Sequence, residues 1–281
     1  MVQTVCVCGA GTMGRGIAQV AAQSSLPVVL YDVHAESLEK AHVALQADLQ
    51  ALVDRKKISP QEQAAISSQI RFSSDLNDCI ADIIIEAIVE RTAVKVGLFN
   101  QLAEVNHSET IFATNTSSLS VTELARQVVQ PSRLAGMHFF NPAPVMKLVE
   151  VVNTSFTSPA TTAAIMTLAR QFGKTPVLCQ DAPGFIVNHV ARPYYLEALR
   201  LVEPGLTDME TVDSLLEATG FRMGPFKLMD LIGNDINYAV SCSVYEQLGS
   251  PLRLQPSPIQ AAKVSKGELG RKTGKGYYQY S

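Results

Sequence analysis

The chain has 281 residues, of which 47% are hydrophobic and 17% are charged, and its formal net charge at pH 7 is −3. This composition is typical of a soluble globular protein, and it offers no general basic surface for nucleic acid. The longest apolar runs, such as residues 83–85, are far too short to cross a bilayer, so we expect no membrane partner.

Short runs of β-branched residues alternate with longer helical stretches over the first two-thirds of the chain. The expected strands cover residues 2–8, 28–31, 81–87, 110–114, 134–139 and 147–152. The expected helices cover residues 13–24, 35–57, 92–105, 121–128 and 159–172. This rhythm predicts an α/β fold of the Rossmann type, a doubly wound and mostly parallel sheet with helices on both faces.

The pattern changes after residue 181, where Pro183 and Gly184 interrupt the chain. Helical stretches follow at residues 185–202, 208–218, 225–248 and 257–265, and we expect no strand among them. We therefore predict an NAD-binding Rossmann domain over residues 1–183. A smaller, all-helical substrate and dimerisation domain should cover residues 184–281. The apolar faces of its longer helices could pack within one chain or against a second copy, and we predict a homodimer.

Five scattered cysteines, an odd number, favour reduced thiols and a cytoplasmic protein over a disulfide framework. Cys6 and Cys8 form a C-x-C pair, which the alternation of a buried strand explains better than metal binding. No second cluster of cysteine or histidine stands near them in the sequence, so we expect no metal site.

Gly9, Gly11 and Gly14 form a G-x-G-x-x-G motif that follows the first expected strand and opens a helix. Gly9 allows a tight turn, Gly11 lets the backbone approach a pyrophosphate, and Gly14 lets the helix lie close to the strand. Thr12 and Met13 belong to the same loop, where the helix N-terminus offers N–H groups to an anion. The motif therefore predicts a dinucleotide site.

Asp32 ends the second expected strand and can accept hydrogen bonds from both hydroxyls of an adenosine ribose. A carboxylate at this position would repel a 2′-phosphate, so we predict NAD as the cofactor. The simpler alternative is a glycine turn and an acidic strand end without any ligand, and the combination of motif, helix and acid argues against it.

Further motifs follow in the middle of the chain. His138 lies in M-H-F-F-N-P and Glu150 in K-L-V-E-V, with N-T-S-S-L at 115–119 before them and D-A-P-G-F-I-V-N at 181–188 after them. This series, in this order, closely resembles the 3-hydroxyacyl-CoA dehydrogenase family, and the resemblance covers residues 5–280. It implies the reversible, NAD-dependent oxidation of an (S)-3-hydroxyacyl-CoA to a 3-oxoacyl-CoA.

The residues suit that chemistry. Oxidation of a secondary alcohol requires loss of a hydride to the nicotinamide and loss of the hydroxyl proton, and histidine accepts protons near neutral pH. We predict that His138, just past a strand, is the general base and that Glu150, at the end of the next strand region, orients its imidazole. An isolated histidine would more simply be a core residue, and the flanking motif and Glu150 favour catalysis here.

Other site residues follow from the resemblance alone. Ser117 and Asn188 match the family's two substrate-contacting positions, although Ser117 could instead cap a helix unless Ser118 or Ser120 does so. Residues at positions that contact the cofactor in the family are Glu90, Lys95, Asn115 and Lys272. Without the family, Lys95 would be a solvated helix residue and Lys272 part of a solvated tail.

The CoA moiety should meet a basic element. Arg55 and Lys56 end the helix over residues 35–57 and match the CoA-contacting element of the family. Cations at a helix C-terminus also complement the helix dipole, which is the simpler explanation. Asp48 departs from the family pattern, because mammalian members carry a CoA-contacting Ser at this position, and an acid there does not favour an anionic CoA.

The acyl chain is less defined. Residues 191–198 resemble bacterial members of the family, which act on short-chain 3-hydroxybutyryl-CoA or on 3-hydroxyadipyl-CoA in phenylacetate breakdown. We expect the short-chain substrate, yet Arg192, Arg222 and Lys227 could meet a distal carboxylate. Two other classes stay open: a β-hydroxyacid dehydrogenase that does not use CoA, and an NAD-binding protein without catalysis.

Overall fold

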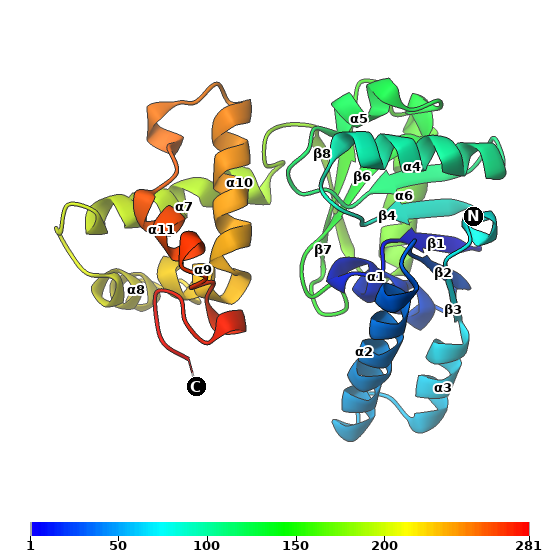
Figure 1. The fold of residues 1–281 in the computed structure, drawn as a ribbon, viewed down its shortest axis with the longest axis horizontal. Helices are drawn as coiled ribbons and strands as arrows, with labels where there is room; N and C mark the ends of the chain where they lie inside the picture. Colours follow the sequence, from blue (N-terminus) through cyan, green and yellow to red (C-terminus); the bar gives the residue numbers. More distant parts are fainter. Residues whose placement is uncertain (1, 281) are drawn as a thin grey trace. The chain divides into compact units, whose positions relative to one another are not determined.

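The computed structural model of the protein describes residues 2–280 (Figure 1). The chain divides between Asp181 and Ala182 into two compact units. The first unit contains an eight-stranded sheet with helices, and in the second unit the described residues form helices and only isolated β-bridges. The predicted architecture, a Rossmann-type sheet followed by a helical domain, is confirmed. No helix among the described residues is both long enough and apolar enough to span a membrane.

The sheet has the strand order β3-β2-β1-β4-β5-β6-β7-β8. The strands are β1 (Val5–Cys8), β2 (Val28–Tyr31), β3 (Ile70–Ser73), β4 (Ile83–Glu86), β5 (Ile111–Thr114), β6 (Leu134–Phe139), β7 (Leu148–Asn153) and β8 (Thr175–Gln180). Every neighbouring pair is parallel except β6 and β7. The strand order reverses between β1 and β4, and doubly wound sheets bind ligands outside the carboxyl ends of strands at such a point.

Two apolar layers cover the faces of the sheet. Its helices are α1 (Thr12–Gln23), α2 (Ala35–Asp54), α3 (Pro60–Ser68), α4 (Thr92–Val105), α5 (Val121–Gln127) and α6 (Pro159–Gln171), with short 3₁₀ turns η1 (Leu76–Asp78) and η2 (Pro131–Arg133). Val5 and Val7 of β1 belong to the core formed with α1, α2 and α6, whereas Cys6 and Cys8 belong to the core formed with α4 and α5. Successive side chains of a strand point to opposite faces, so β1 serves both cores.

The second unit packs its helices around a core that includes Tyr195, Leu199, Phe226 and Met229. Its helices are α7 (Val187–Val202), α8 (Met209–Ala218), α9 (Pro225–Ile232), α10 (Asn234–Gln247) and α11 (Pro258–Ser265), with 3₁₀ turns η3 (Leu252–Leu254) and η4 (Arg271–Thr273). The expectation of a single helix over 225–248 is wrong. Gly233 adopts φ 106° between α9 and α10, a conformation that side chains with a Cβ rarely reach.

Three elements were absent from the sequence expectation. The edge strands β3 and β8 are partly exposed, so neither shows the continuous run of buried apolar residues that marks a central strand. In addition, β8 contains Pro176, which is typical of edge strands. Helix α3 carries a recognisable start, because Ser59 and Glu62 form a capping box around Pro60. The helix expected to reach residue 57 ends at Asp54.

A buried carboxylate fixes the start of α9. Asp213 of α8 is fully buried, and it accepts hydrogen bonds from the backbone N–H groups of Phe226 and Lys227, each at 2.9 Å. The hydroxyl of Tyr278 donates a third hydrogen bond to Asp213, at 2.8 Å. One side chain therefore caps α9 and ties it to the end of the chain.

Replacement of Asp213 by alanine should lower the free energy of unfolding by about 3 kcal/mol, because buried N–H groups lose their acceptor. Urea titration would measure the loss. The matched control is Asp208→Ala, which removes the exposed N-cap of α8 and should cost about 1 kcal/mol. Equal losses for the two variants would contradict a special role of Asp213.

Candidate active site

The glycine loop joins β1 to α1 at the carboxyl edge of the sheet. Gly9 has φ 106°, and a Cβ there would lie 2.5 Å from the carbonyl oxygen of Ala87. A Cβ on Gly14 would lie 1.8 Å from the carbonyl oxygen of Gly9, so helix and turn are in contact. A Cβ on Gly11 would meet nothing within 4 Å, and no side chain caps the N-terminus of α1. The first backbone N–H groups of α1 therefore have no side-chain acceptor, and the space beside Gly11 is open, which suits an anion.

Asp32 is held beside this loop at the end of β2. One carboxylate oxygen accepts a hydrogen bond from the backbone N–H of Ala10 at 2.8 Å, and the other accepts one from the backbone N–H of His34 at 3.0 Å. Each carboxylate oxygen has a second lone pair, so the group can still accept hydrogen bonds from ribose hydroxyls. The glycine loop and Asp32 together fit a dinucleotide.

His138 and Glu150 are paired across the only antiparallel ladder in the described sheet. They are direct partners in the register of β6 and β7, and His138 Nδ1 lies 2.8 Å from Glu150 Oε2. The two residues are 5% and 1% exposed. A carboxylate at Nδ1 accepts the Nδ1–H hydrogen bond, which makes Nε2 the nitrogen that can take a proton.

Their positions along the strands differ from the sequence expectation. His138 lies inside β6, before its last residue, and Glu150 lies in the middle of β7. Because β7 runs antiparallel to β6, its middle comes beside the carboxyl end of β6. The ring of Phe140 lies 4.6 Å from the His138 ring, centroid to centroid, and packs against it.

The loop after β5 supplies the polar residues next to this pair. Asn115 accepts a hydrogen bond from the backbone N–H of Phe139 at 2.8 Å, which ties the loop to the end of β6. Ser120 caps α5 and donates to Asp181 at 2.7 Å. The N-cap role is thus filled by Ser120, and half-buried Ser117 forms no hydrogen bond with the described residues.

Lys95 is buried, contrary to the alternative expectation of a solvated helix residue. It is 1% exposed, and its Nζ lies 2.5 Å from Glu86 Oε1 and 3.0 Å from Glu90 Oε2. Glu86 also accepts hydrogen bonds from the Thr114 hydroxyl and the Ile88 backbone N–H, each at 2.7 Å. Glu86 is not among the residues predicted from the sequence, although an acid that directly follows three isoleucines at a strand end is an unusual feature.

The pKa values of the two carboxylates around Lys95 are shifted in opposite directions. Burial raises the pKa of Glu86, and the attraction of Lys95 and the hydrogen bond from Thr114 offset this only in part. Burial also acts to raise the pKa of Glu90, but Lys95 and the hydroxyls of Thr116 and Ser118 outweigh it, so that this pKa is lowered. The cluster carries two acids and one base, and it links β4, β5 and α4 beside the carboxyl edge of the sheet.

The remaining predicted residues lie in varied surroundings. Arg55 and Lys56 are exposed and follow the end of α2. Asp48 forms an ion pair with Arg15 of α1, which offsets the charge that departs from the family pattern. In the second unit, Asn188 is half-buried in the first turn of α7, and Lys272 pairs with Asp235 at 2.6 Å.

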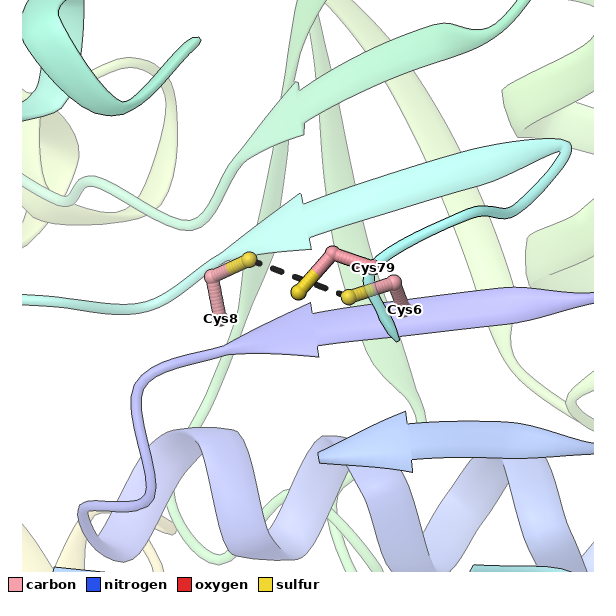
Figure 2. A group of neighbouring side chains, drawn as sticks. All are labelled: Cys6, Cys8 and Cys79. Atoms are coloured by element: carbon pink, nitrogen blue, oxygen red, sulfur yellow. Dashed lines mark hydrogen bonds between the residues drawn. The ribbon is translucent and has the colours of Figure 1, made fainter. Parts of the chain in front are cut away.

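Figure 2 shows a cluster of Cys6, Cys8 and Cys79, the one group of metal-ligating type found among residues 2–280. Their sulfur atoms lie within 4.8 Å of one another, and all three side chains are buried in an apolar core. Hydrogen bonds within the cluster and burial raise the pKa of Cys6 and Cys8. Hydrogen bonds with Cys6 and Cys8 lower the pKa of Cys79 to about 5. Buried cysteines pack as small hydrophobic groups, and all three lie in such an apolar core.

Comparison with known proteins identifies the family. Residues 4–182 match the model of the 3-hydroxyacyl-CoA dehydrogenase NAD binding domain, and residues 184–280 match that of the 3-hydroxyacyl-CoA dehydrogenase C-terminal domain. The chain belongs to the 3-hydroxyacyl-CoA dehydrogenase family. The family and the NAD cofactor predicted from the sequence are thereby confirmed, and the protein is an oxidoreductase of this family.

Individual relatives carry two kinds of name. The chain is 46% identical to 3-hydroxyadipyl-CoA dehydrogenase of Escherichia coli K12 over 99% of its own length and 59% of that protein. It is 40% identical to the mitochondrial hydroxyacyl-coenzyme A dehydrogenase of Sus scrofa over 100% of its own length and 92% of that protein. The chain thus spans about three-fifths of the E. coli relative and most of the mammalian one.

Solved structures agree with this assignment. A structure of 3-hydroxybutyryl-CoA dehydrogenase from E. coli K12 matches with a TM-score of 0.95 at 46% identity, over 100% of this chain and 60% of that one. A structure of (S)-3-hydroxybutyryl-CoA dehydrogenase from Ralstonia eutropha matches with a TM-score of 0.94 at 36% identity, over 100% of both chains.

Within this family member, Lys95→Met should lower the free energy of unfolding by about 3–5 kcal/mol, because it leaves Glu86 buried without its cation. Chemical denaturation would measure the change. Lys40→Met is the control, since Lys40 forms an exposed pair with Glu36 and its loss should cost under about 0.5 kcal/mol. Adding Glu86→Gln to Lys95→Met should recover part of the stability, and no recovery would contradict the explanation.

Proposed function

We propose that the protein catalyses the reversible, NAD-dependent oxidation of an (S)-3-hydroxyacyl-CoA to the 3-oxoacyl-CoA. The observation that carries the proposal is the buried pair of His138 and Glu150, with 2.8 Å between Nδ1 and Oε2. Strands β1, β4, β5 and β6 are parallel, so the glycine loop and His138 lie at the same edge of one sheet. A proton acceptor and a dinucleotide site at one edge are what alcohol oxidation requires.

Each side chain has a separate task in this proposal. NAD supplies the acceptor for the hydride from the substrate carbon. His138 Nε2 takes the hydroxyl proton, while Glu150 keeps the ring in place and stabilises the imidazolium that forms. In the reverse direction the same imidazolium returns the proton. Ser117 and Asn188 donate hydrogen bonds to the substrate's oxygens and stabilise charge that develops on them.

The cofactor and CoA positions extend the proposal. Residues 1–183 bind NAD through the glycine loop and Asp32, and residues 184–281 form the substrate and dimerisation domain. Proposed cofactor neighbours are Glu90, Lys95, Asn115 and Lys272, and proposed CoA contacts are Arg55 and Lys56. The burial of Lys95 supports a holding role, in which its ammonium fixes Glu90 and the end of β4.

The proposed substrate carries one of two acyl chains, that of 3-hydroxybutyryl-CoA or the dicarboxylic chain of 3-hydroxyadipyl-CoA. Relatives with 3-hydroxybutyryl-CoA in their names cover this chain at 36% and 46% identity. A relative named for 3-hydroxyadipyl-CoA, at 46% identity, supports a dicarboxylic alternative. The two esters share the reacting carbons and differ at the far end of the acyl chain, so that any discrimination must come from contacts away from His138.

We further propose a cytoplasmic homodimer. All five cysteines are free, as expected in a reducing compartment. Helices α9 and α10 expose Leu231 and Ile236, at 50% and 47%, outside the core of the second unit. Exposed apolar side chains on adjoining helices favour a self-complementary interface between two copies.

The catalytic assignment is tested by measuring the reduction of acetoacetyl-CoA by NADH, which is monitored as a loss of NADH absorbance. His138→Gln should lower kcat by about 10³-fold or more, and Glu150→Gln by about 10²-fold or more, with NADH affinity retained in a fluorescence titration. His107→Gln, a change at an exposed histidine, is the control and should keep activity. Normal turnover by His138→Gln would refute the assignment, and activity on free 3-hydroxybutyrate alone would refute the CoA substrate.

Light scattering coupled to gel filtration tests the homodimer. The wild-type protein should have twice the chain mass of 30.4 kDa. The double variant Leu231→Lys and Ile236→Lys should shift toward the monomer, because it places charges on the proposed interface. Val43→Lys, at a 62% exposed valine of α2, is the control and should stay dimeric. A monomeric wild-type protein would refute the proposal.

A further inference from the structure

Arg192 of α7 is the one buried arginine among residues 2–280, with 2% of its surface exposed. The ion pairs of the described chain involve other basic side chains, and Arg192 belongs to none of them. A buried charge is costly when no opposite charge accompanies it. This arginine therefore needs an explanation beyond packing.

All contacts of the guanidinium are neutral. Nε donates to the carbonyl oxygen of Asn188 at 2.9 Å, and Nη1 donates to the carbonyl oxygen of Asn237 at 3.0 Å and to the Ser241 hydroxyl at 2.8 Å. The Tyr195 ring lies 5.0 Å from the guanidinium carbon. Burial lowers the pKa of Arg192 to about 10, which still leaves the side chain charged at neutral pH.

A donor without a hydrogen-bond partner lies next to this cation. Asn237 is 2% exposed, and its Oδ1 accepts a hydrogen bond from Gln260 Nε2 at 3.0 Å and lies 3.5 Å from Arg192 Nη1. Because the atom that faces two N–H donors must be the amide oxygen, the orientation of the Asn237 amide is fixed. Its nitrogen, Nδ2, therefore points away from these two donors. That Nδ2 is buried and has no hydrogen-bond partner. Two adjacent donors, one of them charged, thus lack an anionic acceptor.

We propose that Arg192 and Asn237 Nδ2 form a carboxylate-binding site that holds the distal carboxylate of a dicarboxylic 3-hydroxyacyl-CoA. The inference rests on the proposed function and adds a specificity-determining residue to it. Nε and Nη1 already donate to protein acceptors, so Nη2 is the guanidinium group that would donate to the carboxylate, and the Asn237 amide N–H extends that donor set. Asn188, the proposed substrate contact, lies one helical turn before Arg192, and its carbonyl accepts the Nε hydrogen bond.

The other two cations named by the sequence do not share these features. Lys227 is bound to both carboxylate oxygens of Glu217, at 3.0 and 2.9 Å, so its charge is already paired. Arg222 is exposed, where water screens its charge. Arg192 is the cation of the three that is both buried and unpaired with an acid.

Calorimetry with adipyl-CoA and hexanoyl-CoA tests the site directly. The two esters have the same chain length and differ only in a terminal carboxylate or methyl group, and neither can be oxidised at a 3-hydroxyl. The wild-type protein should bind adipyl-CoA about 10- to 100-fold more tightly. Arg192→Met should abolish or reverse this preference. The control Arg222→Met should retain it.

Asn237→Asp provides a second variant that does not depend on the loss of the arginine. Its carboxylate would accept the bonds from Gln260 and Arg192 and act as an internal counterion, so the preference for adipyl-CoA should disappear while the melting temperature is kept or raised. If Arg192 had a structural role only, Arg192→Met would instead weaken the binding of both esters equally. Equal binding of the two esters by the wild-type protein would overturn the inference, whatever the folding of the variants.

The proposed function is tested separately by turnover. The kcat/KM values for acetoacetyl-CoA and 3-oxoadipyl-CoA should favour the dicarboxylic ester in the wild type, and this ratio should fall by about 10- to 100-fold in Arg192→Met, mainly through KM. An adipyl-CoA preference without turnover of any 3-oxoacyl-CoA would refute the reaction and support the site. Turnover with an unchanged ratio would refute the site and support the reaction.

Discussion

The antiparallel ladder between β6 and β7 is the constraint on which the proposed catalytic arrangement depends. In that ladder His138 and Glu150 are direct cross-strand partners, so both side chains leave the sheet on the same face. A slip of one residue would carry Glu150 to the other face and leave the imidazole without its carboxylate. Both side chains are buried, and the tight core on either side of the sheet holds this register.

The rest of the sheet gathers its polar groups at one edge. Parallel strands β1, β4, β5 and β6 end at the same edge, and at or beside these ends lie the glycine loop, the Glu86 cluster, Asn115 and His138. The strands themselves are nearly all apolar and buried. The polar residues of the proposed site thus lie at the strand ends, while the apolar interior of the sheet supplies rigidity.

Buried charges recur in both units, and their partners indicate their roles. Lys95 is matched by Glu86 and Glu90, and Asp213 by two N–H groups and a hydroxyl, so these charges are satisfied within the fold. Arg192 also has only neutral partners, but beside it Nδ2 of Asn237 has no acceptor. A charge whose surroundings supply all of its hydrogen bonds serves stability, whereas donors left without an acceptor are suited to receive a ligand.

The sequence by itself determined the alternation of strands and helices, the dinucleotide loop, Asp32 and the family, because these features are local or occur as ordered motifs. It also predicted that His138 and Glu150 lie beside each other, although it placed them at strand ends. Only the tertiary structure decided that β6 and β7 are antiparallel, that Gly233 divides one expected helix, and that the edge strands β3 and β8 exist.

The burial of individual charged side chains is likewise decided by the tertiary structure alone. Lys95 in sequence looks like any helix lysine, and Arg192 like any basic residue, because nothing nearby in the chain shows whether the side chain will be enclosed. Glu86 meets Lys95 and Thr114, and Arg192 meets Asn237 and Ser241, through contacts between residues far apart in sequence. The free energy of a charge depends on its surroundings, and those surroundings form only when distant segments pack together.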